Sequence, residues 1–258
     1  MTTLRDWRRV AILAGMSDEQ FHTMPDGTRI AYRHTAGEGP TLVFLPGYMS
    51  DMDGGKATAV FERARAQGRA ALLLDYSGCG RSEGDFADGS LSGWRDQVLS
   101  LLAAVDAGPV VLVGSSMGGW LMLLIALALP ADRRAGLIGI APAPDFTTWG
   151  YSDAQLASLA GGETIFEDNP YGPEPTPTHP KFWADGQANL LLDGQIALDC
   201  PVRLIHGQAD SGVPWNVSLR LAAALRSEDV CVHLIKDGDH RLSREQDIAL
   251  LLRVVDAL

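Results

Sequence analysis

The sequence is poor in cysteine and in basic residues. Its three cysteines, Cys79, Cys200 and Cys231, are odd in number and far apart, with no metal-ligand spacing between them. We therefore expect free thiols in a reducing compartment and no metal site. Lysine and arginine total 21 against 32 aspartates and glutamates, which gives a formal net charge of −11. A charge of this sign repels phosphate backbones and anionic membranes, so nucleic-acid binding is disfavoured.

Long apolar runs are also missing. The longest, at residues 120–129, is too short to span a bilayer, so no stable membrane insertion is expected. At the N-terminus, arginines precede a short apolar run at residues 10–16, but an Ala-x-Ala cleavage pattern is absent. We predict an amphipathic segment there and a cytoplasmic protein.

What the sequence does contain is a series of short apolar segments that alternate with helix-length segments. A β-hairpin is predicted around the turn signal Pro25-Asp26-Gly27. The apolar segments that follow lie at residues 41–47, 70–76, 109–114, 135–141, 201–207 and 230–238. Continuous apolar strands separated by helices indicate a parallel sheet with both faces covered. The predicted fold class is α/β, with a mostly parallel central sheet of about eight strands flanked by helices.

The alternation stops between residues 143 and 197, where "GPEPTPTHP" is rich in proline. Because apolar strands resume afterwards, we interpret this insertion as a cap over one end of the sheet rather than as a hinge between domains. The expected organisation is a single domain, with a core of residues 1–142 and 198–258 and a cap of residues 143–197.

A candidate nucleophile follows the third of the apolar segments. In Gly114-Ser115-Ser116-Met117-Gly118, the central residue of the pattern G-x-S-x-G is Ser116. Glycine at both flanking positions permits a tight turn from strand to helix, known as a nucleophile elbow. The serine then lies at a helix N-terminus, where free N–H groups favour developing negative charge. A glycine-rich turn without a chemical role is the alternative.

A serine nucleophile requires a base, and the base requires an acid that holds its tautomer. Of the six histidines, His240 lies on the loop between the last strand and the last helix, at the same end of the sheet as Ser116. Asp210 follows the apolar segment at residues 201–207, and the order Ser116, Asp210, His240 is the one expected for this arrangement. Asp145, which follows the segment at residues 135–141, remains the rival acid.

Two backbone N–H groups are predicted to form an oxyanion hole. One is that of Met117, directly after the candidate nucleophile, and the other is that of Tyr48, after the first apolar strand. In the predicted cap, the aromatic side chains of Trp149, Tyr171 and Trp183 are candidates for lining an apolar substrate pocket, although packing within the cap is the alternative.

Several segments together resemble a known family. They are "LPGYMSDMDGGKA", "LLLDYSGCGRSEG", "WRDQVLSLL", "LVGSSMGGWLML", "CPVRLIHGQADSGVPW" and "GDHRL", in this order from residue 41 to the C-terminus. The sequence resembles the α/β-hydrolase superfamily and, within it, the family of α/β-hydrolase domain-containing protein 10 and its bacterial relatives.

The resemblance implies an α/β-hydrolase fold and a serine esterase or thioesterase that removes palmitoyl groups from S-acylated cysteines and cleaves acyl glucuronides. By position, Ser116 matches the nucleophile, Asp210 the acid and His240 the base. The cap segment matches the family poorly. The animal members are mitochondrial, but Asp6 and the absence of a Ser/Arg-rich composition differ from a transit peptide, so a cytoplasmic location is still expected.

We therefore expect a serine hydrolase that cleaves carboxylic esters or thioesters of medium acyl chains and requires no cofactor. The expected partners are small-molecule esters or thioesters, or an S-acylated protein or peptide. A cofactor-free perhydrolase or a carbon–carbon bond hydrolase would use the same three residues. A catalytically inactive hydrolase fold that serves as a binding module is the alternative from another class of protein.

Overall fold

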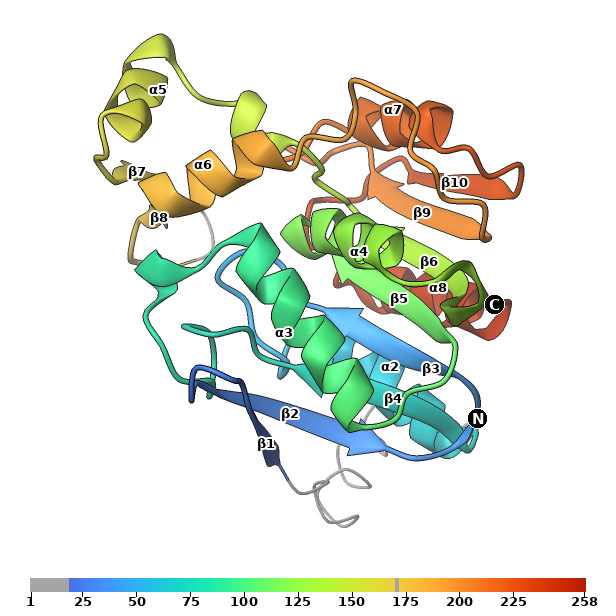
Figure 1. The fold of residues 1–258 in the computed structure, drawn as a ribbon. Coiled ribbons are helices and arrows are strands. Elements are labelled where there is room, and N and C mark those ends of the chain that lie inside the picture. The colour runs from blue at the N-terminus through green and yellow to red at the C-terminus, as the bar shows by residue number, and fades with distance from the viewer. Residues whose placement is uncertain (1–18, 170–171) are drawn as a thin grey trace.

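A sheet of eight strands forms the centre of the molecule (Figure 1). The computed structural model describes residues 19–169 and 172–258. In chain order the strands are β1 (Gln20–Thr23), β2 (Arg29–Thr35), β3 (Glu38–Leu45), β4 (Arg69–Leu74), β5 (Val110–Ser115), β6 (Arg134–Ile140), β9 (Val202–Gly207) and β10 (Val230–Ile235). Their spatial order is β1-β2-β4-β3-β5-β6-β9-β10.

The direction of the strands matches the sequence pattern. β1 and β2 form the predicted hairpin, and β2 continues antiparallel onto β4. Every ladder from β4 through β3, β5, β6 and β9 to β10 is parallel. The predicted fold class, a mostly parallel α/β sheet of about eight strands, is therefore confirmed.

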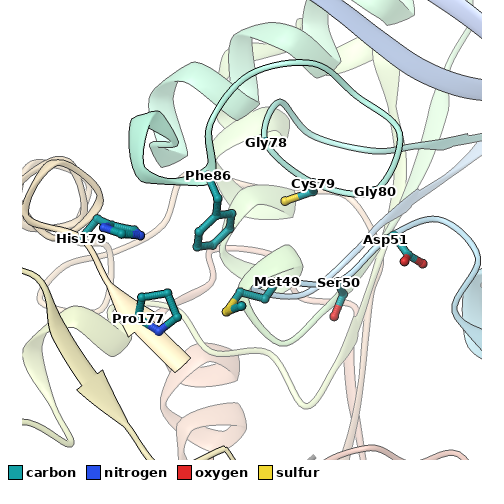
Figure 2. Close-up of a pocket in the computed structure, with 9 residues that line it drawn as sticks. All are labelled: Met49, Ser50, Asp51, Gly78, Cys79, Gly80, Phe86, Pro177 and His179. Atoms are coloured by element: carbon teal, nitrogen blue, oxygen red, sulfur yellow. The ribbon is translucent and has the colours of Figure 1, made fainter. Parts of the chain in front are cut away.

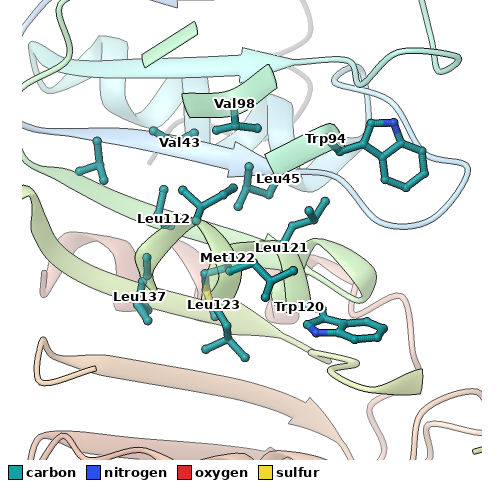
Figure 3. Close-up of a cluster of buried hydrophobic side chains, with 14 of the residues drawn as sticks. Val43, Leu45, Trp94, Val98, Leu112, Trp120, Leu121, Met122, Leu123 and Leu137 are labelled. Carbon is teal, nitrogen blue, oxygen red and sulfur yellow. The ribbon is translucent and has the colours of Figure 1, made fainter. Parts of the chain in front are cut away.

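Helices cover both faces of the sheet. One face carries α2 (Gly55–Ala66) and α8 (Glu245–Asp256), and the other carries α3 (Leu91–Ala104), α4 (Met117–Ala128) and α7 (Asn216–Ala224). Each face has its own apolar cluster, and the one beneath α3 and α4 includes Trp94, Leu112 and Trp120 (Figure 3). Parallel strands are buried on both faces, which explains why they appear in the sequence as continuous apolar runs.

Helix α4 lies at the centre of this packing. It is apolar all round because it lies against the sheet on one side and under neighbouring helices on the other, and ten of its twelve residues are buried. Helix α3 begins at the N-cap Ser90, whose side chain accepts a hydrogen bond from the N–H of Gly93 at 3.1 Å. Rigid elements thus lead directly to the carboxyl end of the sheet, where the candidate residues lie.

The chain leaves the sheet between β6 and β9. Residues 143–197, which we call the 143–197 segment, contain α5 (Asp153–Ala160), β7 (Ile165–Glu167), β8 (Thr176–Thr178) and α6 (Pro180–Ala188). β7 and β8 pair with each other as a separate two-stranded sheet. In Figure 1 the segment extends beyond the ends of the central strands, beside the start of α3.

Hydrogen bonds fasten the 143–197 segment to the core. Tyr48 donates its hydroxyl hydrogen to the carbonyl oxygen of Pro177 at 2.9 Å, and the indole N–H of Trp120 donates to the carbonyl oxygen of Asn189 at 3.0 Å. Asp185 accepts a hydrogen bond from the N–H of Ser92 at 2.8 Å. The donors belong to the loop after β3 and to the first turns of α4 and α3, so the segment is held at the carboxyl end of the sheet.

Candidate active site

Ser116 occupies the turn between β5 and α4. Its backbone has φ 55° and ψ −119°, a conformation that non-glycine residues rarely adopt. The flanking glycines allow this turn to pack closely. A Cβ at Gly114 would lie 2.3 Å from the carbonyl oxygen of Gly118, and a Cβ at Gly118 would lie 2.1 Å from that of Leu45. Only glycine fits at either position, as the sequence pattern predicts.

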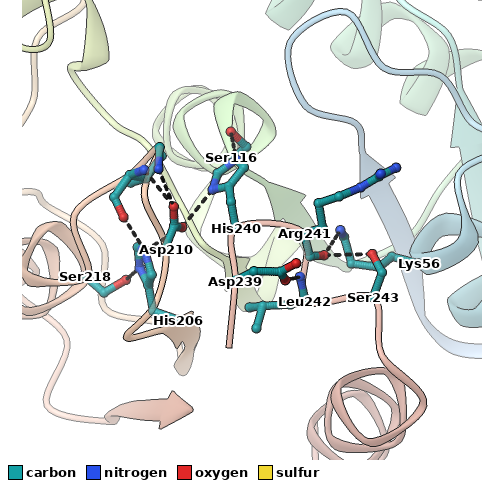
Figure 4. Close-up of polar contacts among 12 residues, drawn as sticks. Lys56, Ser116, His206, Asp210, Ser218, Asp239, His240, Arg241, Leu242 and Ser243 are labelled. Atoms are coloured by element: carbon teal, nitrogen blue, oxygen red, sulfur yellow. Dashed lines mark hydrogen bonds and ion pairs between the residues drawn. The ribbon is translucent and has the colours of Figure 1, made fainter. Parts of the chain in front are cut away.

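Ser116, His240 and Asp210 meet at the carboxyl end of the sheet (Figure 4). The Oγ of Ser116 lies 3.1 Å from Nε2 of His240, and Nδ1 of His240 lies 2.7 Å from Oδ2 of Asp210. The imidazole is 18% exposed and the carboxylate is fully buried. The three predicted residues therefore form a continuous chain of hydrogen bonds.

The partners of His240 define its tautomer. An ionised carboxylate only accepts hydrogen bonds, so Nδ1 of His240 donates its N–H to Asp210. In the neutral ring Nε2 then has a free lone pair, and it accepts the hydrogen bond of the Ser116 hydroxyl. This is the arrangement in which an imidazole can take a proton from a serine.

The Asp210 carboxylate is saturated with donors. Its Oδ1 accepts hydrogen bonds from the backbone N–H groups of Gly212 at 2.9 Å and Val213 at 2.8 Å. Its Oδ2 accepts the His240 bond and lies 3.2 Å from Nε2 of His206. Burial by itself would raise the pKa of Asp210, but the contacts with His206 and His240 and the bond from Val213 outweigh it and lower the pKa below the ordinary value of 3.8. Asp210 is therefore a stable anion facing the imidazole.

The rival acid Asp145 has a different set of partners. Its carboxylate accepts hydrogen bonds from the N–H of Leu191 at 2.9 Å and from that of Leu192 at 2.7 Å. Its backbone is left-handed, with φ 60°, and only 5% of the residue is exposed. Asp145 thus holds the end of the 143–197 segment, while Asp210 contacts His240.

The two predicted oxyanion donors lie beside Ser116. Met117 directly follows the serine as the first residue of α4. A Cβ at Gly47, next to Tyr48, would lie 3.4 Å from the Cβ of Ser116, so the loop after β3 passes close to the serine. Among the described residues, neither the N–H of Tyr48 nor that of Met117 donates a hydrogen bond to a protein acceptor. Both groups are therefore available to an oxygen bound next to Ser116.

A pocket of about 310 Å³ adjoins this loop (Figure 2). Its lining residues come from the loops after β3 and β4 and from the 143–197 segment: Met49, Ser50, Asp51, Gly78, Cys79, Gly80, Phe86, Pro177 and His179. The rings of Phe86 and Phe182 each lie 4.9 Å from that of Tyr48, next to the pocket. Burial raises the pKa of the Cys79 thiol to about 12, so this cysteine is a protonated wall residue rather than a nucleophile at neutral pH.

Neither Trp149 nor Trp183, two of the three aromatic residues predicted to line a substrate pocket, is among the lining residues of this pocket. Trp149 packs against Phe146 and the apolar cluster around Val213. Trp183 lies in α6, and the indole nitrogens of Trp149 and Trp183 are both buried without a hydrogen-bond partner. Tyr171 is outside the described residues. A role of these three side chains in substrate binding stays a prediction.

One contact at the site has no counterpart in the sequence analysis. His206 lies within the apolar segment at residues 201–207, which indicated only a buried strand, yet its imidazole reaches the carboxylate of Asp210. The available signal was the spacing of four residues across the end of β9, where the last residues of a strand and the following turn can face each other.

No group of three or more histidine, cysteine, aspartate or glutamate side chains in residues 19–169 and 172–258 has the arrangement of a metal site. In the same part of the chain, no helix has the length and apolar composition needed to cross a membrane. Cys79, Cys200 and Cys231 are free thiols, and Cys231 is exposed.

Comparison with known proteins identifies the family. The sequence profile of the alpha/beta hydrolase family matches residues 42–251, and the chain belongs to that family. The mouse protein named palmitoyl-protein thioesterase ABHD10, mitochondrial, is 42% identical over 234 residues, which cover 89% of this chain and 78% of the mouse protein. The family resemblance predicted from the sequence is confirmed.

Solved structures agree with this assignment. A putative hydrolase from Agrobacterium vitis S4 matches with a TM-score of 0.86 at 36% identity, over 93% of this chain and 98% of that one. Alpha/beta hydrolase domain-containing protein 10 from mouse also matches with a TM-score of 0.86, at 38% identity, over 93% of this chain and 97% of that one.

The predicted cytoplasmic location is corrected by the same comparison. The mouse, rat and human relatives are all named mitochondrial, so the cytoplasmic assignment is withdrawn. That assignment depended on Asp6 and on the composition of the N-terminus. Relatives that match most of the chain are stronger evidence of location than the composition of a few residues. The amphipathic segment predicted there lies outside the described residues.

Proposed function

We propose that this hydrolase cleaves carboxylic esters or thioesters through an acyl-enzyme intermediate. Ser116 is the nucleophile, His240 the base and Asp210 the acid that orients the base. The observation that supports this assignment is the chain of two hydrogen bonds, 3.1 Å from Ser116 to His240 and 2.7 Å from His240 to Asp210. Distances of this size are those required for proton transfer between nucleophile and base.

In the proposed first step, Oγ of Ser116 attacks the substrate carbonyl carbon while its proton passes to Nε2 of His240. The carbonyl oxygen becomes an oxyanion and accepts hydrogen bonds from the N–H groups of Tyr48 and Met117. The imidazolium, stabilised by the Asp210 carboxylate, then donates the proton to the departing oxygen or sulfur.

In the second step, water attacks the acyl-enzyme. His240 takes a proton from the water as a new C–O bond forms, and the oxyanion again lies between Tyr48 and Met117. His240 then returns the proton to Oγ of Ser116 as the acyl–serine bond breaks, which releases the carboxylic acid and the original enzyme. The steps involve only these groups, the substrate and water.

The proposed substrate class follows from the relatives and from the surroundings of the serine. Mammalian relatives are named palmitoyl-protein thioesterases, which indicates an acyl thioester as one substrate type. We propose that the 143–197 segment acts as a cap whose apolar side chains receive a medium acyl chain. A small-molecule ester or an S-acylated peptide both present such a chain.

Trp149 and Trp183 remain the proposed substrate-contacting residues of this cap, together with Tyr171. Buried N–H groups without an acceptor are uncommon in folded proteins, and both indoles have one. An ester or thioester substrate brings oxygen acceptors into the site, so a bound substrate would relieve one of these unpaired donors.

Labelling with a fluorophosphonate tests the proposed chemistry. The probe should react covalently with folded wild-type protein at Ser116, and Ser116→Ala should abolish both labelling and nearly all turnover of a short p-nitrophenyl ester. Ser115→Ala is the matched control, because it changes the adjacent serine and should keep most of the activity. Labelling at Ser115, or no labelling of the folded protein, would instead favour a shifted nucleophile or a binding module.

A further inference from the structure

His206 is the penultimate residue of β9, and its side chain lies next to the proposed acid. Its side chain is fully buried, and both ring nitrogens have partners (Figure 4). Nε2 lies 3.0 Å from the carbonyl oxygen of Val213 and 3.2 Å from Oδ2 of Asp210, whereas Nδ1 lies 2.7 Å from Oγ of Ser218. One imidazole therefore contacts the carboxylate of Asp210, the end of the Asp210–Val213 turn and helix α7.

The protonation of this ring follows from its partners. The Val213 carbonyl and the Asp210 carboxylate can only accept hydrogen bonds, so Nε2 of His206 must bear the hydrogen that faces them. In the neutral ring Nδ1 is then an acceptor, and the buried Ser218 hydroxyl donates to it. Val213 and Asp210 thus select the tautomer of His206 in which a donor points toward Asp210, and the Ser218 hydroxyl satisfies Nδ1 of that tautomer.

We propose that His206 is a positioning residue for the reaction proposed above, holding Asp210 in the rotamer that meets His240. Its Nε2–H faces Oδ2 of Asp210 on the side away from His240, and the same N–H donates to the carbonyl oxygen of Val213. This role rests on the proposed function, because it has kinetic meaning only if Asp210 orients the base.

The geometry of the turn explains why such a support is needed. Asp210 Oδ1 already accepts the N–H groups of Gly212 and Val213, which belong to the same short turn as Asp210 itself. Those two bonds move with the turn and do not fix it relative to the sheet. Backbone bonds from Asp210 N–H to Gly207 and from Ala209 N–H to Gly238 hold the start of the turn. His206 adds a side-chain contact from β9 to the Asp210 carboxylate itself, and its backbone belongs to the parallel ladder with β10.

The matched strand partner supplies a control. His233 lies on β10, one strand away, and pairs in register with Ile205, the neighbour of His206. It is also a partly buried strand histidine, but it lies outside the Asp210 contacts described above. His233→Leu should therefore leave kcat and KM unchanged. If replacing a partly buried strand histidine lowered activity in general, the loss would also appear in this variant.

Two substitutions at His206 separate positioning from packing. His206→Leu removes the donor, and because a hydrogen bond to a buried carboxylate is lost, kcat for a p-nitrophenyl ester should fall about 10- to 100-fold with KM little changed. His206→Gln keeps an N–H near the position of Nε2 and should recover most of that loss. Equal kcat for the Leu variant and wild type, or no difference between Leu and Gln, would overturn the proposal.

A double-mutant cycle with Asp210→Asn provides the decisive readout. If His206 acts through Asp210, His206→Leu should slow fluorophosphonate labelling strongly in the wild-type background and by less than about threefold in the Asp210→Asn background. If His206 had only a structural role, His206→Leu would lower the labelling rate by the same factor in both backgrounds, and that result would refute the proposal. If Ser116→Ala still turns over the ester in parallel assays, the proposed function itself has failed instead.

Ser218→Ala keeps the test usable if His206→Leu does not fold. The variant removes the donor to Nδ1 but leaves the imidazole in place, so it should lower kcat less than His206→Leu does, and only when Asp210 is intact. The same loss in the Asp210→Asn background would contradict the proposed chain from Ser218 through His206 to Asp210.

Discussion

Asp145 and Asp210 are two buried aspartates at the same edge of the sheet, and their pKa values are shifted in opposite directions. They follow the adjacent parallel strands β6 and β9, and each accepts hydrogen bonds from two backbone N–H groups. Burial is the largest influence on both and raises the pKa of Asp145 above its ordinary value, where its backbone donors do not compensate. At Asp210 the histidine contacts and the backbone donor reverse the sign, and the pKa falls below that value.

The difference shows that position at the strand end does not by itself define the acid. The carboxylate oxygens of Asp145 accept hydrogen bonds from the N–H groups of Leu191 and Leu192, and these bonds join the 143–197 segment to the sheet. Asp210 leaves one oxygen for two imidazoles, His206 and His240. One aspartate is an anchor of the segment and the other is a partner of the proposed base.

The largest expected effect separates the two aspartates kinetically. Asp210→Asn should lower kcat by about 10⁴-fold, because the amide no longer selects the tautomer of His240 that accepts the Ser116 proton. Asp145→Asn should lower kcat far less, because it does not contact His240. Steady-state kinetics on a p-nitrophenyl ester, with folding checked by circular dichroism, would measure both, and the reverse order of effects would move the acid to Asp145.

A smaller effect concerns the chain length of the acyl group. Each buried methylene contributes about 0.8 kcal/mol, so a pocket that accepts four more carbons than acetyl should raise kcat/KM by roughly a hundredfold. Assays of p-nitrophenyl esters and acyl thioesters from two to sixteen carbons would test this preference for medium chains.

The same series of acyl chain lengths also distinguishes the roles of the two aspartates. Asp145→Asn should flatten the chain-length preference, because loosening the 143–197 segment disturbs the proposed cap, whereas Asp210→Asn should scale all chain lengths down alike. Strict preference for acetyl in the wild type would contradict a lipid-type acyl pocket.

The smallest expected effect is on stability as a function of pH. The depressed pKa of Asp210 stabilises the folded state above pH 3.8, and this contribution is lost as the pH falls below that value, because the unfolded chain then binds the proton first. The raised pKa of Asp145 has the opposite sign: the folded state binds the proton first, so the wild type gains stability as the pH falls toward 3.8.

Urea unfolding of wild type, Asp210→Asn and Asp145→Asn between pH 3 and 6 would measure these differences. The stability advantage of wild type over Asp210→Asn should shrink toward low pH, and its advantage over Asp145→Asn should grow. Parallel curves for the two variants would show that the two carboxylates have the same electrostatic environment.

Much of the sheet could be predicted because buried parallel strands leave a simple pattern. The segments at residues 70–76 and 109–114 correspond to β4 and β5 within two residues at each end. β3 begins at Glu38, before the apolar run, because Glu38 already pairs with Arg69, and a register shift follows between Glu38 and Leu42. β7 and β8 have three residues each, which is too short for any periodicity to appear.

The site was predictable where chain order and loop position were sufficient. Ser116, His240 and Asp210 each follow a strand that ends at the same edge, so their meeting could be anticipated from the parallel sheet. The contact of His206 could not, because the direction of a side chain at a strand end depends on the turn that follows. The choice between Asp145 and Asp210 likewise depended on hydrogen-bond partners contributed by distant residues.

The hydrogen bond between Ser116 and His240 joins residues 124 positions apart, across a sheet whose central ladders are all parallel. Pairings of such long sequence separation form slowly during folding, since large loops must close first. A partly folded chain with β5 and α4 in place therefore still has Ser116 without His240, its proposed base. Recovery of ester hydrolysis after dilution from denaturant should lag behind recovery of helical signal, so that hydrolysis would report when this long-range contact forms.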